Sequence, residues 1–226
     1  MKIKYFAEIG LNYLGKSRYI DQYLDKLCKS NIDGVTIQVL NNNFYKDNFK
    51  SYKISNSNLI KFVQKLKKNK KLVGFVTNDL SNIRFLKKFN VDFFKVLSSN
   101  INDHTLIKNL LASNAQKIYL STGLANYKKI NNILKKIKTN IKKLSLIHTS
   151  FKKEKKYINL NRINLLKRKY NLPICYGNHS KYLGSIIDAK KYQPYAIFFY
   201  VKLNKKLSYP DNIHAIELKK IKQYIL

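Results

Sequence analysis

The stretch "LVGFVTNDLSNIRFLKKFNVDFFKVLSS", residues 72–99, contains the repeating unit that decides the fold. It begins and ends with short runs rich in β-branched and aromatic residues, 72–77 and 92–98. Between these runs, residues 80–89 form a longer amphipathic segment with helical spacing of the apolar residues. Two strand-like runs joined by a helix-like segment are typical of a parallel βαβ unit.

The same alternation runs along the whole chain. Strands are predicted at 3–9, 34–40, 72–77, 92–98, 117–122, 144–149, 173–178 and 196–201. Helices are predicted at 17–30, 58–68, 80–89, 104–112, 127–139, 160–170, 181–191 and 215–225. Eight βα units without a linker rich in Pro, Gly or Ser predict one compact (β/α)8 TIM barrel over residues 1–226. A doubly wound open sheet is the alternative, since the spacing alone does not exclude it.

The composition is that of a globular protein with a large positive charge. Apolar residues make up 45% and aromatic residues 13%, which excludes a disordered chain. Lys and Arg number 45 against 12 acidic residues, and the net charge of +33 is of the kind found in proteins that bind nucleic acid or anionic membranes. However, the lysines recur with helical periodicity beside abundant Asn, Ile and Tyr. AT-rich codon usage would give the same composition, and solvated helix faces can hold the charge, so nucleic acid is not the expected partner.

Cysteine usage and hydropathy favour a cytoplasmic protein. Cys28 and Cys175 are far apart and belong to no CxxC pattern, so neither a zinc site nor a disulfide framework is indicated. The longest apolar run, "YAIFFYV" at 195–201, is much shorter than the roughly 20 residues of a membrane helix. Glu8 and Asn12 interrupt the apolar run at the N-terminus, which is unlike a secretory signal.

Polar residues recur at the carboxyl ends of the predicted strands, where α/β barrels carry their reactive groups. The candidates are Glu8, Gln38, Thr77, Lys95, Ser98, Ser121, His148, His179 and Asp211. A lysine inside a buried strand, such as Lys95, is costly unless it meets an anion or a carboxylate. Glu8 is a candidate partner for that lysine.

Several of these residues also have a purely structural interpretation. Ser121 begins a Ser-Thr-Gly segment that could be a strand end followed by a glycine turn. His148 could be a core imidazole, and Asp211 follows Pro210 as in many turns. His179, in "CYGNHS" at 175–180, could belong to a solvated turn after a buried strand.

Five segments resemble, in the same order, the motifs of the phosphoenolpyruvate-dependent sialic acid (N-acetylneuraminate) synthase family. They are "AEIGLNYLG" at 7–15, "FFKVLSSNINDHTLI" at 93–107, "IYLSTGLANYKKI" at 118–130, "LPICYGNHS" at 172–180 and "YPDN" at 209–212. The resemblance spans nearly the whole chain. Its most specific parts are the AEIG-x-N opening and the STG segment.

The resemblance implies a barrel transferase that condenses phosphoenolpyruvate with an N-acyl hexosamine, an amino sugar, in carbohydrate biosynthesis. The products are phosphate and a nine-carbon ulosonic acid. It also implies a divalent metal, manganese or magnesium, which two histidines hold and which polarises the sugar aldehyde. Homodimerisation is compatible with this interpretation.

The family's functional positions can be carried over residue by residue. Those that bind phosphoenolpyruvate correspond to Thr77, Lys95, Ser98 and Ser121, those that bind the sugar to Gln38 and Asp211, and the first metal ligand to His179. We therefore expect Glu8, Lys95 and Asp211 in catalysis. Asn12 and His148 are expected among the substrate-binding residues.

The chain departs from the family pattern at several of these positions. Thr36 stands in place of a phosphate-binding lysine, Asn100 in place of a carboxylate and Gly177 in place of a serine. Tyr200 occupies the position of the second metal histidine, so an ion would be held weakly unless carboxylates or His214 contribute. The loop after His148 is short and rich in lysine, where the family has a Tyr-Pro segment that helps hold the sugar.

Family synthases also carry a C-terminal antifreeze-like domain that supplies an arginine to the partner subunit's site. Because the chain stops at Leu226, we expect this domain to be absent. The first hypothesis is a divergent ulosonic acid synthase. The second, favoured by Thr36 and Tyr200, is a noncatalytic homologue that acts as an anion-binding or regulatory partner in surface-glycan biosynthesis. The third is a nucleic-acid binder driven by charge.

Overall fold

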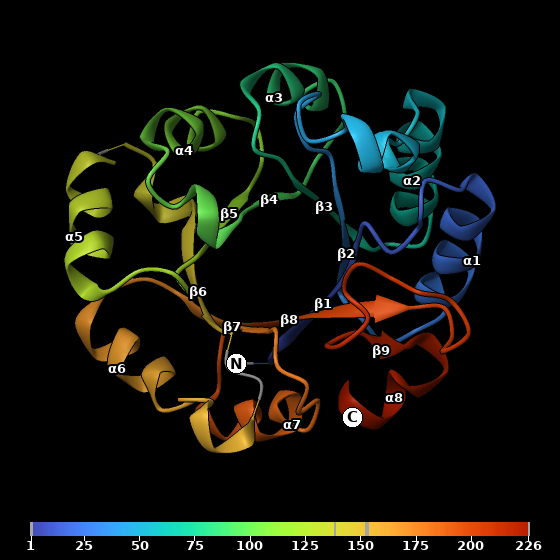
Figure 1. The fold of residues 1–226 in the computed structure, drawn as a ribbon. Coiled ribbons are helices and arrows are strands. Elements are labelled where there is room, and N and C mark those ends of the chain that lie inside the picture. Colours follow the sequence, from blue (N-terminus) through green and yellow to red (C-terminus); the bar gives the residue numbers. More distant parts are fainter. Residues whose placement is uncertain (1, 138, 152–153, 226) are drawn as a thin grey trace.

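The computed structural model describes residues 2–137, 139–151 and 154–225 of the chain. Its strands are β1 (Lys4–Gly10), β2 (Gly34–Gln38), β3 (Leu72–Val76), β4 (Phe93–Val96), β5 (Lys117–Ser121), β6 (Leu144–Ser150), β7 (Ile174–Asn178) and β8 (Ala196–Lys202). They pair in parallel in chain order, and β1 also pairs with β8. The ring of strands is therefore closed (Figure 1), which confirms the predicted barrel and excludes the open sheet.

An outer ring of helices surrounds the strands (Figure 1). The helices are α1 (Ser17–Cys28), α2 (Asn56–Lys68), α3 (Leu80–Leu86), α4 (His104–Leu111), α5 (Tyr127–Lys136), α6 (Arg162–Lys169) and α7 (Ser185–Ala189). Short 3-10 turns add η1 (Asp47–Tyr52), η2 (Ser98–Asn100), η3 (Ile141–Lys143), η4 (Lys155–Tyr157) and η5 (Lys190–Tyr192). Within the described ranges, no helix combines the length and apolar character needed to cross a bilayer.

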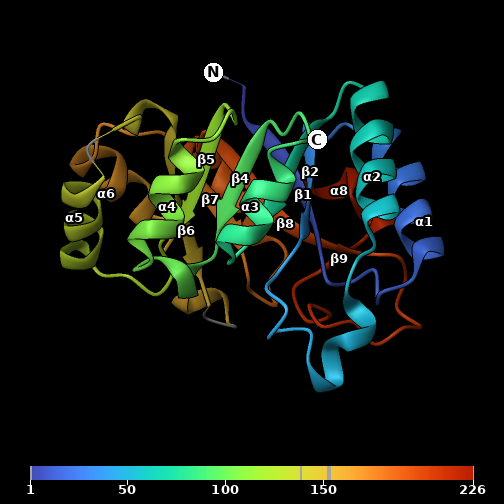
Figure 2. The same cartoon turned by 90° about the horizontal axis from the view of Figure 1, so that it is seen from above.

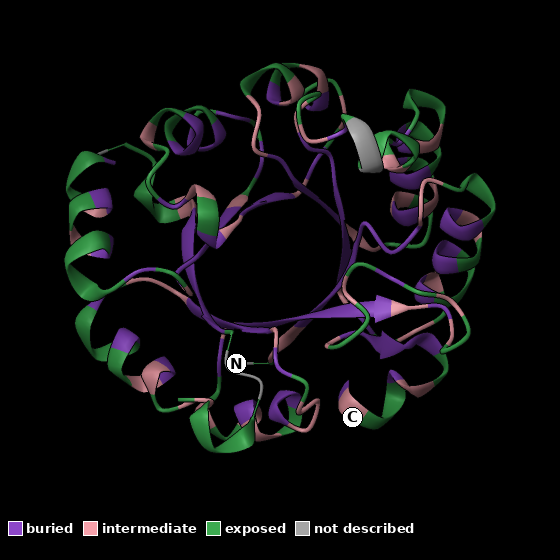
Figure 3. Cartoon of the chain, in the orientation of Figure 1, coloured by how far each residue is buried: buried purple, intermediate pink, exposed green. Residues whose placement is uncertain are grey.

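The helices are amphipathic, and their lysines lie on the outer surface. In α5, Ile130 and Ile133 are buried while Lys128, Lys129 and Lys136 are exposed. Figure 3 shows the same division around the ring, with buried strands inside and exposed helix faces outside. The helical periodicity of the lysines therefore distributes the positive charge around the barrel.

Side-chain caps fix where several helices begin. Ser55, Asp79, Asp103 and Asn126 each accept a hydrogen bond from a backbone N–H in the first turn of the following helix. Such caps satisfy donors that have no partner within the helix. They fix where the chain turns from the strand ends into α2, α3, α4 and α5.

The barrel interior is layered. An apolar layer consists of Phe6, Phe93, Tyr119, Ile147, Cys175, Ala196 and Phe198. The Phe6 ring lies 4.6 Å from that of Phe93 and 4.8 Å from that of Phe198. Because side chains alternate along a strand, the residue two positions further on points inward as well. The next layer towards the carboxyl ends therefore contains Glu8, Lys95, Ser121, Thr149, Gly177 and Tyr200.

The end of the chain differs from the prediction of one helix over 215–225, which is wrong. The structure has a strand β9 (Ile216–Glu217), a 3-10 turn η6 (Leu218–Lys220) and a short α8 (Lys222–Ile225). Ile216 pairs with Val201, and Glu217 pairs with Lys202. Pairing with the exposed end of β8 thus replaces the first turn of the expected helix. The helix predicted at 127–139 ends at Lys136, and residue 138 lies outside the described residues.

Candidate active site

A small cavity opens at the carboxyl ends of the strands, which face downward in Figure 2. It has a volume of about 230 Å³ and is lined by Lys95, Leu97, Ser98, Ser99, Ser121, Leu124, Phe151 and His179. Ligand pockets usually measure roughly 300–1,000 Å³, so this one suits a small molecule or one part of a larger ligand. Together with the inward-pointing layer beside it, this cavity is called the cup below.

A buried ion pair lies at the centre of the cup. Lys95 Nζ, from β4, donates to Glu8 Oε2, from β1, at 2.5 Å, and both side chains are 1% exposed. The pairing of β1 with β2 shifts register between Glu8 and Gly10, an irregularity of the kind often found beside active sites. Burial raises the pKa of Glu8, and the positive charge of Lys95 opposes that rise. Lys95 therefore has a carboxylate partner, as its place in a buried strand required.

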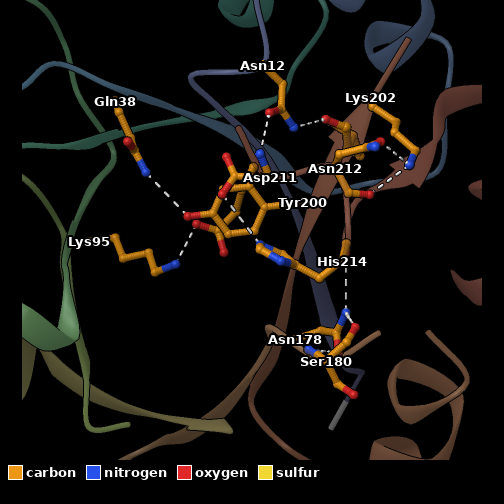
Figure 4. A network of polar contacts seen from close by, with 12 residues as sticks. Asn12, Gln38, Lys95, Asn178, Ser180, Tyr200, Lys202, Asp211, Asn212 and His214 are labelled. Atoms are coloured by element: carbon orange, nitrogen blue, oxygen red, sulfur yellow. Dashed lines mark hydrogen bonds and ion pairs between the residues drawn. The ribbon is translucent and has the colours of Figure 1, made fainter. Parts of the chain in front are cut away.

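Tyr200, from β8, stands beside this pair. Its hydroxyl accepts a hydrogen bond from Gln38 Nε2 at 3.3 Å (Figure 4). Burial, and then the charges of Glu8 and Asp211, raise the pKa of Tyr200 well above its usual 10, so the phenol is neutral. A Cβ on Gly10 would lie 2.7 Å from Tyr200 Cε1, and the φ of Gly10 is +57°. Because Gly10 has no side chain, the Tyr200 ring can occupy this space.

His179 lies in a cluster of rings. The centroids of Phe151, Tyr200 and His214 are 5.1, 5.2 and 4.9 Å from that of His179. Phe151 and Tyr200 present edges, whereas His214 is stacked at an interplanar angle of 26°. Burial, followed by the charges of Lys95 and His214, lowers the pKa of His179 well below its usual 6.5. The imidazole of His179 is therefore neutral near pH 7.

Asn12 ties the loop between β8 and β9 to the end of β1. Its Oδ1 accepts from the Asp211 backbone N–H at 3.1 Å, and its Nδ2 donates to the Val201 carbonyl at 2.8 Å (Figure 4). Asp211 Oδ1 in turn lies 3.5 Å from His214 Nε2. Asn12 is fully buried, and both ends of its amide have protein partners. Its geometry suits the positioning of Asp211 and His214 rather than direct contact with a ligand.

The hydroxyl residues predicted to bind phosphoenolpyruvate fall into two groups. Ser98 and Ser121 line the cavity beside Lys95, and Ser98 Oγ accepts from the Gly123 N–H at 3.1 Å. Thr77, by contrast, is not among the residues that line the cavity. Its hydroxyl accepts from the Asp79 N–H at 3.3 Å in the turn that precedes α3. The structure thus brings the two serines to the cup but holds Thr77 in a local turn.

His148 lies on the outward face of β6 and does not line the cavity. Ile147 points into the barrel, so the alternation of the strand directs His148 towards the helices and gives Thr149 the inward position. The His148 ring is 6.1 Å from that of Tyr176 on β7. Burial, and then the nearby Arg162, lowers its pKa to about 4. This placement corrects the expected position of His148 and matches a core imidazole.

The structure adds residues to the cup that the sequence did not single out. Leu124 and Phe151 line the cavity with 57% and 45% of their surfaces exposed. Each follows the end of a strand, which was the signal available in the sequence. Their exposed apolar surface can contact the apolar face of a ligand. In the lysine-rich loop after Phe151, residues 152–153 lie outside the described part of the chain.

The donor set of the cup does not fit a metal ion held by three protein ligands. Over the described ranges, no three His, Cys, Asp or Glu side chains are grouped so that they could hold an ion. His214 does lie beside His179, but the two imidazoles are stacked face to face. Tyr200 supplies a phenol that already accepts from Gln38.

A larger groove of about 410 Å³ lies outside the barrel, between the segment before α6 and α7. Its lining includes Lys155, Asn159, Tyr182 and Tyr192. None of the predicted site residues lines it. We therefore place the candidate site in the cup, where the buried ion pair, the two serines and His179 converge.

The sequence matches a known family and several relatives. The model of the NeuB family matches residues 26–225. An uncharacterized protein of Methanocaldococcus jannaschii, MJ1065, is 23% identical over 229 residues, which cover 97% of this chain and 68% of the relative. The N,N'-diacetyllegionaminic acid synthase of Campylobacter jejuni is 27% identical over 149 residues. That match covers 64% of this chain and 44% of the enzyme.

Solved structures share the barrel. The N-acetylneuraminic acid synthetase of Leptospira borgpetersenii, in complex with citrate, gives a TM-score of 0.92 at 22% identity and covers 100% of this chain and 82% of its own. The spore coat polysaccharide biosynthesis protein spsE of Bacillus subtilis gives 0.87 at 18% identity, covering 99% and 66%. A truncated 3-deoxy-D-arabino-heptulosonate 7-phosphate synthase of Thermotoga maritima gives 0.78 at 12% identity, covering 99% and 84%. At these identities the likeness establishes the fold.

Proposed function

The chain belongs to the NeuB family, and from this premise we propose that it is a sialic-acid-type synthase that condenses phosphoenolpyruvate with an N-acyl hexosamine. The sugar aldehyde, phosphoenolpyruvate and one water give a nine-carbon ulosonic acid and inorganic phosphate. A new carbon–carbon bond joins the methylene carbon of phosphoenolpyruvate to the aldehyde carbon. The named synthases among the relatives support this class of reaction.

The observation that carries the proposal is the convergence of four residues at the carboxyl ends of four strands. Glu8, Lys95 and Ser121 come from β1, β4 and β5, and His179 follows β7. Lys95, Ser121 and His179 line one cavity, and Glu8 is bonded to Lys95 beside it. A buried ion pair is weak support for stability alone, because well-packed apolar residues often do as well. Perturbed ionisable groups in a cleft are instead typical of functional sites.

In this proposal Lys95 and the two serines hold the anionic groups of phosphoenolpyruvate. Lys95 Nζ provides the positive charge, and Ser98 and Ser121 provide hydroxyl donors. When an anion enters, Lys95 exchanges part of its contact with Glu8 for the ligand. Glu8 Oε1 has no hydrogen-bond partner among the described residues. Because burial raises its pKa, Glu8 is suited to hold a proton at that oxygen while the aldehyde oxygen gains negative charge.

The sugar is assigned to the side of the cup at Tyr200, where Gln38 and Asp211 lie next to it. Gln38 Nε2 donates to Tyr200, and Asp211 is held by Asn12. Amide and carboxylate groups of this kind orient sugar hydroxyls through hydrogen bonds. Synthases of the NeuB family are typically metal-dependent. We assign no step here to the expected manganese or magnesium ion at His179, because the donor set does not fit one.

A noncatalytic role is the second candidate, and two observations favour it. Thr36 points into the barrel from β2, and its hydroxyl has no partner within the described structure. The charge of Lys95 is matched by Glu8 before any ligand binds. A cup of this kind could bind an anion without turning it over. The chain would then act as a binding partner in surface-glycan biosynthesis.

A phosphate-release assay decides between the two candidates. The purified chain is incubated with phosphoenolpyruvate and a panel of N-acyl hexosamines, both free and phosphorylated. We expect release with at least one sugar and a loss of roughly 100-fold or more in Lys95→Met, the scale seen for removal of one electrostatic group. Lys117→Met is the matched control, because Lys117 begins β5 at the opposite end of the barrel. Absence of release with every sugar, despite binding of phosphoenolpyruvate, would favour the noncatalytic role.

A further inference from the structure

Tyr200 is built into the cup by contacts on several sides. Its side chain is 2% exposed, its hydroxyl accepts from Gln38 Nε2 at 3.3 Å, and its ring meets those of His179 and His214 edge-on. The resemblance to the synthase family predicts a histidine at position 200, as the second ligand of a divalent ion. The tyrosine is thus part of a packed arrangement and not an isolated replacement.

We infer that Tyr200 closes the divalent-ion position, so that the cup works with fixed protein charge instead of a resident metal ion. This inference rests on the proposed synthase function and specifies how its carbonyl substrate is polarised. The groups available for that task are Glu8, through a proton at its Oε1, and the second amide hydrogen of Gln38, with the fixed charge of Lys95 nearby.

The donor geometry is the first support for the inference. Catalytic metal sites commonly use about three protein ligands that converge on one point. No such trio of His, Cys, Asp or Glu exists among the residues that the structure describes. His179 and His214 are stacked at 4.9 Å between centroids, and Asp211 Oδ1 lies 3.5 Å from His214 Nε2. The nearest donors are therefore arranged as a ring stack and a carboxylate–imidazole pair.

The distribution of charge is the second support. Lys95 Nζ lies 5.7 Å from the centroid of the Tyr200 ring, so an ion at this position would stand next to an ammonium group. Two like charges at such a distance repel each other strongly where water is excluded. Glu8, whose carboxylate could attract the ion, is bonded to Lys95 at 2.5 Å. The lysine thus occupies the electrostatic role that a metal would otherwise take.

The fit between Gly10 and Tyr200 is the third support. A Cβ on Gly10 would lie 2.7 Å from Tyr200 Cε1 and 3.2 Å from Tyr200 Cδ1, so the ring occupies the space directly over the glycine. An imidazole at position 200 is smaller and lacks the phenol oxygen. A histidine at this position would supply a nitrogen ligand and leave space for an ion next to His179. The substitution Tyr200→His should therefore create the ion site that the natural chain lacks.

The test measures Mn²⁺ binding directly, by the loss of the free-ion signal in electron paramagnetic resonance during titration of the chelator-stripped protein. We expect the natural chain and Tyr200→Phe to leave the Mn²⁺ signal at its protein-free intensity. Tyr200→His should bind one ion at least tenfold more tightly than the natural chain, and the added change His179→Ala should abolish that gain. His104→Ala is the matched control, because His104 begins α4 outside the cup.

Two results would overturn the inference. One is stoichiometric Mn²⁺ binding by the natural chain that His179→Ala abolishes. The other is a folded Tyr200→His variant that gains no ion site. If circular dichroism shows that Tyr200→His does not fold, the comparison of the natural chain with His179→Ala decides alone. The Mn²⁺ titration measures ion binding and the phosphate-release assay measures turnover. A negative result in one experiment therefore does not decide the other.

Discussion

Glu8 and Lys95 illustrate how one residue pair can serve stability and chemistry together. They come from β1 and β4 and are both 1% exposed, so each side chain is buried against the opposite charge of the other. Loss of one partner of a buried pair leaves an uncompensated charge, whereas loss of both leaves none.

This reasoning predicts the result of a double-mutant cycle. Glu8→Gln and Lys95→Met should each lower the free energy of unfolding by roughly 3–5 kcal/mol. The double variant should lose less than the sum of the two, by about 2 kcal/mol. Urea unfolding measures all three. Single effects below about 1 kcal/mol that simply add would show that the pair is not coupled.

The buried His148 should make the free energy of unfolding depend on pH. Burial and Arg162 lower its pKa to about 4 in the folded chain, below the value of about 6.5 expected in the unfolded chain. Between these values the unfolded chain binds more protons, so stability is lost as the pH falls from about 6.5 to about 4. The full contribution is about 3 kcal/mol, at about 1.4 kcal/mol per pKa unit.

The variant His148→Gln removes this titration. Its free energy of unfolding should therefore fall less steeply than that of the natural chain between pH 7 and 4. Part of the fall should remain in both proteins, because the pKa of His179 is lowered as well. Parallel curves for the two proteins would contradict the assignment.

For individual residues, the sequence predicted the partner of Lys95 but not the direction of His148. A lysine in the middle of "FFKVLSS" needs an anion, so a partner such as Glu8 could be foreseen. The outward direction of His148 could not be, because a shift of one residue in a strand exchanges its two faces. Thr149 was not predicted as a site residue for the same reason, although it takes the inward position on β6.

Among the elements, the loop between β8 and β9 depends on Asn12. The asparagine reaches from the end of β1 to the Val201 carbonyl and the Asp211 N–H, and the loop carries His214 as well. Asn12→Ala removes the side-chain acceptor of the Asp211 N–H and one of two side-chain donors to the Val201 carbonyl, to which Tyr23 Oη still donates at 3.4 Å. It should lower the free energy of unfolding by roughly 1–3 kcal/mol and raise hydrogen exchange in residues 203–215.

The matched control is Asn109→Ala on α4. Asn109 is exposed, and its side chain donates to the Thr105 carbonyl of the same helix. We expect a change within about 0.5 kcal/mol and unaltered exchange in the loop. Equal behaviour of the two variants would show that Asn12 does not hold the loop in place.

The elements themselves were predictable where the periodicity was long and regular. Seven of the eight predicted helices correspond to α1 to α7, because their apolar faces must pack against the barrel. The segment 215–225 was not predictable in this way, because the pairing of Ile216 with Val201 is a tertiary contact. Local spacing carries no signal for that contact.

Over the whole molecule, the net charge of +33 should make stability depend on salt. Lysines on the outer helix faces repel one another, and salt screens this repulsion. We expect the Tm to rise with sodium chloride concentration, by roughly 2–4 °C for each kcal/mol of relieved repulsion. A Tm that falls with added salt would indicate that surface ion pairs outweigh the repulsion.

The dispersed positive charge also determines how the chain interacts with nucleic acid. A dispersed set of lysines gives weak, nonspecific attraction that disappears as salt rises. Persistent, steeply salt-dependent binding to arbitrary DNA at physiological ionic strength would revive the hypothesis of a nucleic-acid binder. Fluorescence anisotropy with a labelled duplex measures this.

The central claim is that the cup at the carboxyl ends of the strands accepts phosphoenolpyruvate. The most direct measurement is a crystal structure of the chain soaked with phosphoenolpyruvate. We predict density for the ligand within hydrogen-bond distance of Lys95 Nζ and Ser121 Oγ, with the Lys95 to Glu8 contact lengthened. Density in the outer groove beside Tyr182, or an ordered cup without ligand at saturating concentration, would contradict the account.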